Sequence, residues 1–323
     1  MTTTQTATVV CAHEFGPAEK VARVEIQPLP APATRQVLIR VLAAPINPAD
    51  LNVFEGTYGV KPPLPVTGGI EGVGVIVETG QQVIAPMRRG WWSTIRLLDK
   101  EDLIAVPDDI PRDVAAMLTI NPPTAYRMLH DFISLQPGEW IIQNAANSGV
   151  GRAVIQIARQ RGWRTVNVVR RRELIEELRG EGADVVVTDE IPLSRQIAAL
   201  TGGAPVRLGL NAVGGENARQ IAKSLAPGGS MVTYGAMARQ PLQLDNGLLI
   251  FRDLTCRGFW LSRWYDVVVS ADRQRMFDEL FTMARAGKFR TPVAKTYPLA
   301  EGPAALAHSA RDSRAGKILF AME

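Results

Sequence analysis

The feature that most constrains this fold is a regular alternation between residues 139 and 235. Short apolar runs at 164–169, 184–188, 206–213 and 230–235 are separated by stretches with helical periodicity, and a further helix is predicted before them at 124–132. Strands joined by helices in this way lie parallel, because each helix returns the chain to the end of the sheet where the next strand starts. The pattern therefore predicts an α/β domain built on a doubly wound parallel sheet.

The two ends of the chain differ from this central part. Residues 1–118 are punctuated by proline and glycine and contain strand-like runs at 36–44 and 68–80. A chain of 323 residues is long enough for two domains. We predict a domain at 119–261 that is inserted into a β-rich domain made of residues 1–118 and 262–323.

Cysteine and histidine are scarce. The chain has two cysteines, Cys11 and Cys256, and three histidines. Two cysteines exclude both a disulfide framework and a four-cysteine zinc site. We expect no metal centre, and we expect two free thiols, as is usual in a reducing compartment.

The charge pattern argues against nucleic acid as a partner. The formal net charge is +4, but the basic residues alternate with acidic ones and form no basic helix face. No apolar run approaches the length of a membrane span, and the polar start has no arginine before Arg23, unlike a transit peptide. We expect a cytoplasmic protein that binds neither nucleic acid nor membrane.

A glycine-containing turn follows the apolar run 140–143. Gly149 and Gly151 stand where a helix begins, so a pyrophosphate could approach the backbone and the helix N-terminus closely. The full dinucleotide fingerprint is absent, because Asn147 and Val154 occupy the positions of its outer glycines. A plain turn would explain the glycine pair alone, whereas the strand before it and the helix after it favour a nucleotide site.

The end of the next predicted strand indicates which nucleotide binds. An NAD site places an acidic residue about 20 residues after the glycines, and here the chain has Arg170, Arg171 and Arg172. Guanidinium groups can clamp the 2′-phosphate of NADPH through paired hydrogen bonds. A solvated helix start is the other interpretation of these arginines; as a cluster at this offset they favour NADPH.

Several motifs in a fixed order resemble a known family. They occupy residues 46–52, 55–59, 68–73, 121–129, 143–151, 211–215, 231–238 and 257–262. Together they resemble the zinc-free branch of the medium-chain dehydrogenase/reductase superfamily, and within it the trans-2-enoyl thioester reductases of the mitochondrial type. Tyr58-Gly59 and the run from Asn147 to Gly151 separate this family from the similar quinone reductases.

The resemblance implies a GroES-like β-rich catalytic domain, a Rossmann NADPH-binding domain and particular site residues. Tyr58 falls at the position of the catalytic proton donor. On pattern alone, a tyrosine in a glycine-rich loop is a packing or surface residue, and only the resemblance favours catalysis. The positions that match cofactor-binding residues are Asn121, Asn147, Ser148, Gly149, Val150, Gly151, Arg170, Arg171, Arg172, Tyr234, Gly235, Ala236, Met237, Phe259, Trp260, Leu261 and Lys317.

Three residues noted through the resemblance, Asp50, Trp260 and Lys317, have simpler interpretations without it. Asp50 fits a helix cap. Trp260 reads as half core and half cofactor wall, and Lys317 would otherwise be an ordinary surface lysine. The chain also departs from the family pattern: it is shorter after residues 78–83, and residues 87–92 follow the pattern loosely. Both departures lie in the substrate-side domain and concern the acyl pocket.

The implied activity is oxidoreductase chemistry in fatty acid metabolism. NADPH would supply a hydride to the β-carbon of an enoyl-CoA or enoyl-ACP, and Tyr58 would protonate the α-carbon, without a metal. A zinc-free NADPH quinone or enone oxidoreductase is the alternative enzyme, and a non-enzymatic nucleotide-binding protein is the alternative outside catalysis. The resemblance also implies a homodimer, with residues 254–261 as the candidate interface strand, and acyl carrier protein as a further partner.

Overall fold

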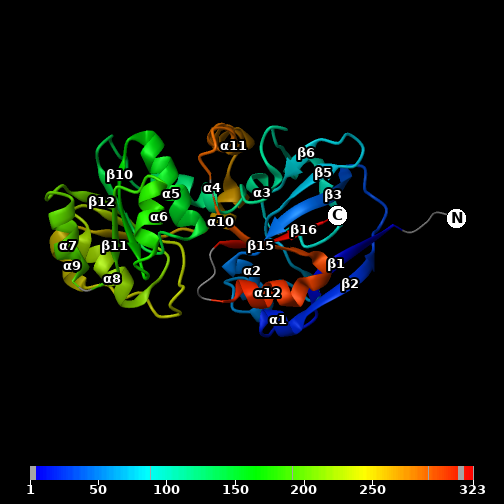
Figure 1. Cartoon of the computed structure of the whole chain (residues 1–323), viewed down its shortest axis with the longest axis horizontal. Helices are drawn as coiled ribbons and strands as arrows, with labels where there is room; N and C mark the ends of the chain where they lie inside the picture. Colours follow the sequence, from blue (N-terminus) through cyan, green and yellow to red (C-terminus); the bar gives the residue numbers. More distant parts are fainter. Residues whose placement is uncertain (1–4, 88, 191, 290, 312–315, 323) are drawn as a thin grey trace. The chain divides into compact units, whose positions relative to one another are not determined.

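The computed structural model describes residues 5–87, 89–190, 192–289, 291–311 and 316–322. The chain divides into two units, which are described separately (Figure 1). The first unit comprises Met1–Ile120 with Val268–Glu323, and the second comprises Asn121–Val267. The chain therefore leaves the first unit once and returns to it once.

The second unit is built on six parallel strands. Their order across the sheet is β11-β10-β9-β12-β13-β14, and all neighbouring pairs are parallel. This order confirms the predicted doubly wound sheet of the nucleotide-binding type. The strands are β9 (Trp140–Gln143), β10 (Arg164–Val169), β11 (Val185–Thr188), β12 (Val206–Asn211), β13 (Ser230–Thr233) and β14 (Thr255–Gly258).

Helices cover both faces of this sheet (Figure 1). The helices are α4 (Asn121–His130), α5 (Gly149–Arg161), α6 (Leu174–Gly180), α7 (Leu193–Leu200), α8 (Gly215–Ser224), α9 (Asn246–Arg252) and α10 (Leu261–Val267). On one face, Ile155 of α5 and Leu178 of α6 pack with Val169 and Val186 of the strands. On the other face, Ile197 of α7 and Ile221 of α8 pack against the sheet. The strands are buried from both sides, which explains their continuous apolar sequence.

Two predicted elements of the second unit have different bounds in the structure. The strand predicted at 254–261 is shorter, because α10 begins at Leu261. The predicted helix 124–132 begins earlier, at Asn121, with Pro122 and Pro123 in its first turn. Proline is compatible with a first turn, since the N–H groups there have no partner within the helix.

The first unit contains two sheets. A three-stranded sheet has the order β2-β1-β4, and a seven-stranded sheet has the order β15-β16-β3-β5-β6-β8, with β7 also paired to β3. The strands are β1 (Thr6–Ala12), β2 (Ala22–Pro28), β3 (Gln36–Pro45), β4 (Val66–Thr67), β5 (Val73–Ile76), β6 (Gln82–Ile84), β7 (Ile95–Asp99), β8 (Ile104–Ala105), β15 (Val293–Pro298) and β16 (Lys317–Ala321). The helices are α1 (Ala18–Val21), α2 (Pro48–Glu55), α3 (Arg112–Ala115), α11 (Ser270–Arg285) and α12 (Gly302–Ser309), with short 3-10 turns at Lys100–Asp102 and Leu299–Glu301.

Aromatic side chains form the centre of the first unit. Trp92 is fully buried and meets the rings of Phe54 and Phe320 edge to face, at centroid distances of 5.5 and 5.4 Å. Gly68 lies directly beneath Trp92, since a Cβ at Gly68 would be 2.0 Å from the indole ring. The glycine-rich run 68–80 was predicted as one strand; only Val73–Ile76 is a strand. The earlier glycines instead make room for tryptophan.

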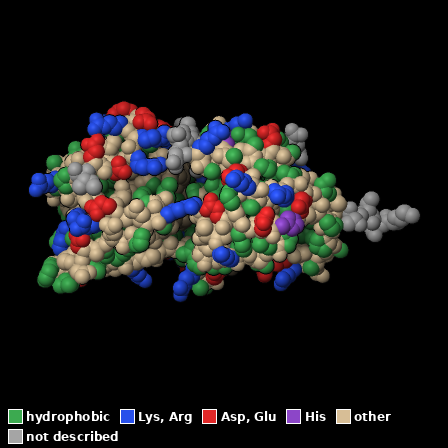
Figure 2. Space-filling model, turned by 90° about the horizontal axis from the view of Figure 1, so that it is seen from below, with side chains coloured by type: hydrophobic (Ala, Val, Ile, Leu, Met, Phe, Trp, Pro, Cys, Tyr) green, Lys and Arg blue, Asp and Glu red, His purple; other side chains and the backbone are tan. Residues whose placement is uncertain are grey.

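The surface charges and the lengths of the helices are relevant to two possible partners, nucleic acid and membrane. Figure 2 shows lysine and arginine side chains interspersed with aspartate and glutamate on the visible face. Among the described residues, none of the helices combines the length and the hydrophobicity that a membrane crossing requires.

Candidate active site

The predicted nucleotide residues gather at the carboxyl edge of the parallel sheet. The glycine turn follows β9, the arginines follow β10, and residues 234–237 and 259–261 follow β13 and β14. Helix α5 after β9 and helix α8 after β12 lie on opposite faces of the sheet, although β9 and β12 are neighbours. Doubly wound sheets bind nucleotides in the crevice that opens at such a point.

The glycine turn forms the N-terminus of α5. The Ser148 hydroxyl caps the helix by accepting a hydrogen bond from the Gly151 N–H at 3.1 Å. Gly151 has no room for a side chain, since a Cβ there would lie 2.5 Å from the carbonyl oxygen of Ala146. A Cβ at Gly149 would lie 2.8 Å from the amide of Asn121. Backbone N–H groups in the first turn of a helix have no partner within the helix. The N-terminus of α5 is therefore favourable for binding an anion.

A buried arginine supports the same turn. Arg152 donates from Nε to the carbonyl oxygen of Asn147 at 3.2 Å and forms ion pairs with Glu177, at 2.6 Å, and with Glu181. Val150 is buried beside it in the first turn of α5. Arg152 thus ties the turn to α6 and its C-terminal end. Sequence reasoning missed this residue, because its acidic partners Glu177 and Glu181 lie 25 and 29 residues further along the chain.

Two asparagines join β9 to β12 where the crevice opens. Asn144 donates from Nδ2 to the side-chain oxygens of Asn211, at 2.8 Å, and Asn217, at 2.7 Å. Its own Oδ1 accepts from the Ala212 N–H at 2.7 Å. Asn211 in turn accepts from the Gly214 N–H at 3.1 Å. Both asparagines belong to motifs noted in the sequence, but the motifs did not predict that they contact each other.

The three predicted arginines differ in their surroundings. Arg172 is exposed and paired with Glu190 at 2.6 Å, and Arg171 lies 3.5 Å from Glu173. Arg170 is exposed, and no ion pair holds it within the described part of the chain. From the sequence, the three arginines were predicted to act together as one phosphate clamp. Among the described residues, Arg170 is the one of the three whose guanidinium has no carboxylate neighbour that would compete with a phosphate.

The segment after β13 follows the same edge. Gly235 approaches β12 closely, since a Cβ there would lie 2.8 Å from the carbonyl oxygen of Ala212. Burial raises the pKa of the Tyr234 phenol, and the nearby Ser148 hydroxyl offsets part of that rise. Ala236 and Met237 are exposed, and Met237 keeps 58% of its surface accessible. An accessible methionine at the carboxyl edge is compatible with a ligand contact.

The segment after β14 contributes a ring and a helix start. The Phe259 N–H donates to the Thr233 carbonyl oxygen at 2.9 Å, and the Phe259 ring lies 5.9 Å from that of Phe132. Trp260 is 41% exposed, whereas Leu261 is buried at the start of α10. Of the three residues predicted here, Trp260 is therefore the one with the most accessible side chain.

Asn121 provides a direct test of whether a nicotinamide nucleotide fits the second unit. Its amide nitrogen is buried and has no hydrogen-bond partner among the described residues. Leaving a buried donor unpaired costs about 1–3 kcal/mol, so a ligand that accepts this hydrogen bond would be favoured. The capped N-terminus of α5 suits the pyrophosphate of such a nucleotide. Arg170, which has no ion-pair partner among the described residues, suits a 2′-phosphate, and the Asn121 donor suits the oxygen of a carboxamide.

Tyr58 belongs to the first unit and follows α2. The helix ends at Gly56, whose φ of 70° is one that glycine adopts readily. The amides of Thr57 and Tyr58 then donate to the carbonyl oxygen of Asn52 at 2.9 and 3.1 Å. The ring of Tyr58 is half-buried against the core of the first unit. The loop that carries Tyr58 is thus fixed by backbone hydrogen bonds.

Lys317 is also in the first unit, and it is buried rather than a surface residue. Its ammonium donates to the side-chain oxygen of Asn47, and Asn47 donates from Nδ2 to Glu71 at 2.8 Å. Glu71 also accepts from the Ile120 N–H at 3.1 Å. The exposed fractions of Asn47, Glu71 and Lys317 are 2%, 0% and 6%. These side chains come from separate parts of the chain, so no local sequence pattern indicates that Glu71 lies in one cluster with Lys317.

Asp50 completes this buried polar cluster, which comprises Asn47, Asp50, Glu71 and Lys317. Its carboxylate accepts from the N–H groups of Asn47 and Ile70, each at 2.8 Å, as expected for a residue that caps α2. Burial raises the pKa of Asp50 to about 6 and that of Glu71 to about 7, and the Lys317 ammonium opposes both rises. The cluster holds two carboxylates and one ammonium.

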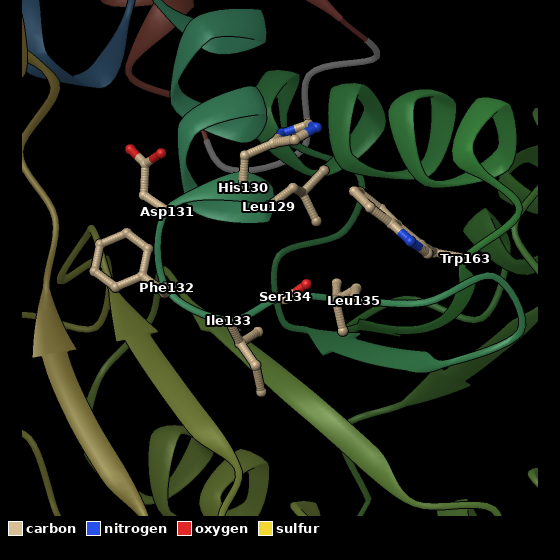
Figure 3. A pocket seen from close by; sticks show the side chains of 8 residues that line it. All are labelled: Leu129, His130, Asp131, Phe132, Ile133, Ser134, Leu135 and Trp163. Carbon is tan, nitrogen blue, oxygen red and sulfur yellow. The ribbon is translucent and has the colours of Figure 1, made fainter.

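A separate pocket lies at the C-terminal end of α4. Figure 3 shows that it is lined by Leu129, His130, Asp131, Phe132, Ile133, Ser134, Leu135 and Trp163. The His130 ring is engaged with its own helix, since Nδ1 lies 2.7 Å from the carbonyl oxygen of Tyr126. None of the predicted site residues lines this pocket, so we place the candidate site at the carboxyl edge of the sheet.

Comparison with known proteins matches both units. Residues 33–92 match the alcohol dehydrogenase GroES-like domain, and residues 149–280 match the zinc-binding dehydrogenase family. The chain is 41% identical over 322 residues to "Enoyl-[acyl-carrier-protein] reductase, mitochondrial" of Mus musculus, which covers 95% of this chain and 86% of the mouse protein. The protein of the same description from Caenorhabditis elegans is 45% identical over 274 residues, covering 80% of this chain and 78% of its own length.

Solved structures agree with this assignment of fold. A mutant of Etr1p in complex with NADP and crotonyl-CoA superposes with a TM-score of 0.88 and 26% identity, over 98% of this chain and 99% of its own. A Bacillus thuringiensis protein provisionally described as an NADPH:quinone reductase gives a TM-score of 0.91 and 28% identity, over 99% of this chain and 100% of its own.

Proposed function

The chain belongs to the mitochondrial-type enoyl thioester reductases of the medium-chain dehydrogenase/reductase superfamily, and from this membership we propose that it reduces the carbon–carbon double bond of trans-2-enoyl thioesters with NADPH. The observation that carries the proposal is the 41% identity with an enoyl-[acyl-carrier-protein] reductase across 95% of the chain. The complex of Etr1p with NADP and crotonyl-CoA names, for that protein, the same cofactor and the same class of substrate.

The residues that would hold NADPH are those at the carboxyl edge of the second unit. The N-terminus of α5, with Asn147, Ser148, Gly149, Val150 and Gly151, would bind the pyrophosphate through backbone N–H groups and the helix dipole. Arg170 would bind the 2′-phosphate as the main cation, with Arg171 and Arg172 contributing less because each already has an acidic neighbour.

The remaining predicted residues would bind the rest of the cofactor. Asn121 would donate its unpaired amide hydrogen to the carboxamide. The walls would be formed by Tyr234, Gly235, Ala236, Met237, Phe259, Trp260 and Leu261. Lys317, the last of the predicted cofactor residues, belongs to the first unit, where its ammonium donates to Asn47. When bound, the nicotinamide supplies the hydride that reduces the β-carbon.

Tyr58 would provide the proton. Reduction at the β-carbon leaves negative charge on the thioester enolate, and a positioned phenol can protonate the α-carbon. The backbone hydrogen bonds between Asn52 and the Tyr58 loop support this role, because a proton donor must be held in one place. The first unit would therefore be the substrate domain and the second the NADPH-binding domain.

Assembly and compartment are parts of the same proposal. The edge strand β14 and the neighbouring helix α9, which exposes 69% of Ile250 and 84% of Phe251, would form a homodimer interface. Etr1p and Etr2p of Candida tropicalis form a heterodimer. The names of the curated relatives place those proteins in mitochondria, and a cytoplasmic location for this chain stays a prediction.

The alternative substrate is a quinone. It is favoured by one observation, the superposition with the Bacillus thuringiensis protein at a TM-score of 0.91. Both activities need the same fold and cofactor, so only the acceptor distinguishes them.

The test is a panel of acceptors with loss of NADPH absorbance as the readout. We expect turnover with crotonyl-CoA or a longer enoyl-CoA, or with an enoyl thioester of acyl carrier protein, and little with a quinone. Turnover of a quinone alone would overturn the proposal in favour of the alternative.

The variant Tyr58→Phe tests the proton donor. We expect kcat with the enoyl thioester to fall by about 100-fold or more, the usual contribution of a general acid. Tyr297→Phe is the matched control, because Tyr297 is a buried tyrosine of the same unit that hydrogen-bonds His308 at 2.9 Å outside the proposed site. Equal activity of Tyr58→Phe and wild type would remove Tyr58 from the mechanism.

A further inference from the structure

Three metal-ligating side chains meet on one face of the β1–β2 hairpin. In the antiparallel pairing, Cys11 lies opposite Arg23 and Val9 lies opposite Glu25, so Cys11 and Glu25 are diagonal neighbours on the same face. His13 follows β1 directly and stands two residues beyond Cys11. The spacing Cys-x-His at the end of β1 and a glutamate on β2 thus bring a thiol, an imidazole and a carboxylate together.

The distances among these groups are short. The Cys11 thiol donates to Glu25 Oε2 at 3.3 Å, and His13 Nε2 lies 2.9 Å from Glu25 Oε1. One ligand atom from each of the three residues lies within 4.8 Å of the others. In a tetrahedral zinc site, with bonds of about 2.0–2.3 Å, ligand atoms lie about 3.5 Å apart. Small side-chain movements would therefore bring all three to one ion.

We propose that Cys11, His13 and Glu25 bind a divalent transition metal ion such as Zn²⁺, with the fourth position open to water. A thiolate, an imidazole and a carboxylate are each ordinary zinc ligands, and three protein ligands with one water are a common arrangement. On binding, the metal forms bonds to sulfur, nitrogen and oxygen, and the thiol proton is released to solvent. The scarcity of cysteine excludes a four-cysteine site but leaves this mixed site open.

The groups around the three ligands include a positive charge, the guanidinium of Arg23, which acts on the Cys11 thiol. The guanidinium of Arg23 donates to the carbonyl oxygens of Lys20 and Ala22. Gln27 lies on the same face, with Nε2 3.4 Å from Glu25 Oε2 and 3.7 Å from Cys11 Sγ, and it would orient the carboxylate. Access is from the His13 side, since the side chain of His13 is 54% exposed while Cys11 is fully buried.

The test is a titration of metal-free, tag-free protein with Co²⁺ as a spectroscopic probe. Cobalt bound by a thiolate gives an intense charge-transfer absorption in the near ultraviolet, whereas cobalt bound only by nitrogen and oxygen does not. We expect this absorption at one equivalent of Co²⁺, and we expect Zn²⁺ to displace it. The readout is independent of catalysis, so it distinguishes failure of this site from failure of the proposed function.

Variants assign the absorption to the site. Cys11→Ser removes the thiolate and is expected to abolish the band, whereas Cys256→Ser, the change of the chain's other cysteine, is expected to retain it. His13→Ala is expected to weaken Co²⁺ binding at least tenfold, and His308→Ala serves as its control. Because His13 is exposed, its variant keeps the test valid if Cys11→Ser fails to fold. No band in the wild type, or a band unchanged by His13→Ala, would overturn the proposal.

Discussion

The variant Glu71→Gln tests whether the second carboxylate of the buried polar cluster, when ionised, lowers the free energy of unfolding. The cluster opposes the carboxylates of Asp50 and Glu71 with the single ammonium of Lys317, all of them buried. Burial raises the pKa of Glu71 to about 7, Asp50 adds to the rise, and Lys317 and the Asn47 hydrogen bond oppose it. Glutamine keeps the shape of glutamate and removes the charge, leaving one carboxylate for one ammonium.

The sign and size of the effect follow from this pKa. The folded state binds the Glu71 proton more tightly than the unfolded state, whose pKa is near the ordinary value of 4.5. The stability that this proton contributes is therefore complete below about pH 4.5 and is lost as the pH rises to about 7. At about 1.4 kcal/mol for each unit of pKa, the rise from 4.5 to about 7 corresponds to about 3 kcal/mol.

The assay is urea unfolding of both proteins at about pH 5 and about pH 8, with the transitions of the two units fitted separately. Relative to wild type, Glu71→Gln is expected to gain about 2–3 kcal/mol in the free energy of unfolding between the two pH values. Glu78→Gln, at an exposed turn, is the matched control and should show no such change. A difference independent of pH, or one in which the variant loses stability as the pH rises, would refute the charge count.

Three further predictions concern the second unit. In a steady-state assay, Arg170→Ala should raise the KM for NADPH by about tenfold or more and leave the KM for NADH nearly unchanged. Arg172→Ala should have a smaller effect on the KM for NADPH, because Arg172 is paired with Glu190. Gly151→Ala should weaken NADPH binding and lower Tm by several degrees, because its Cβ would lie 2.5 Å from a carbonyl oxygen. Gly180→Ala has open space at its Cβ, so in parallel measurements it should change neither NADPH binding nor Tm. Asn144→Ala should cost about 3 kcal/mol in urea unfolding, since it leaves several buried partners unpaired, and a cost below about 1 kcal/mol would contradict that role.

The family, the fold class and most of the second unit could be predicted because their signals are local. Each strand is a short apolar run and each helix has its own period, so their alternation predicted a doubly wound parallel sheet. The strand order β11-β10-β9-β12-β13-β14 came from the structure. The boundaries at 121 and 261 were less accurate. There, proline in a first turn and a short edge strand depend on packing that the local pattern does not record.

The first unit was harder to predict because its organisation is non-local. The hairpin β1–β2 was not predicted, although it brings residues 6–12 against residues 22–28. Asp50 could be predicted as a helix cap because its partner is three residues away. Glu71 could not be predicted, since Asn47 and Lys317 lie 24 and 270 residues from their partners in the cluster.

The asparagines at the crevice show that a polar residue in a sequence motif need not be a ligand-binding residue. At the carboxyl ends of β9 and β12 the chain turns toward opposite faces, so the backbone there loses the partners that a continuing strand would provide. Asn144 and Asn211 supply substitutes by accepting from the N–H groups of Ala212 and Gly214. Where the crevice opens, backbone N–H groups lack strand partners, and polar side chains are required to accept their hydrogen bonds. These two asparagines are explained by the sheet itself, whereas the buried amide nitrogen of Asn121 has no partner among the described residues and is available to a ligand.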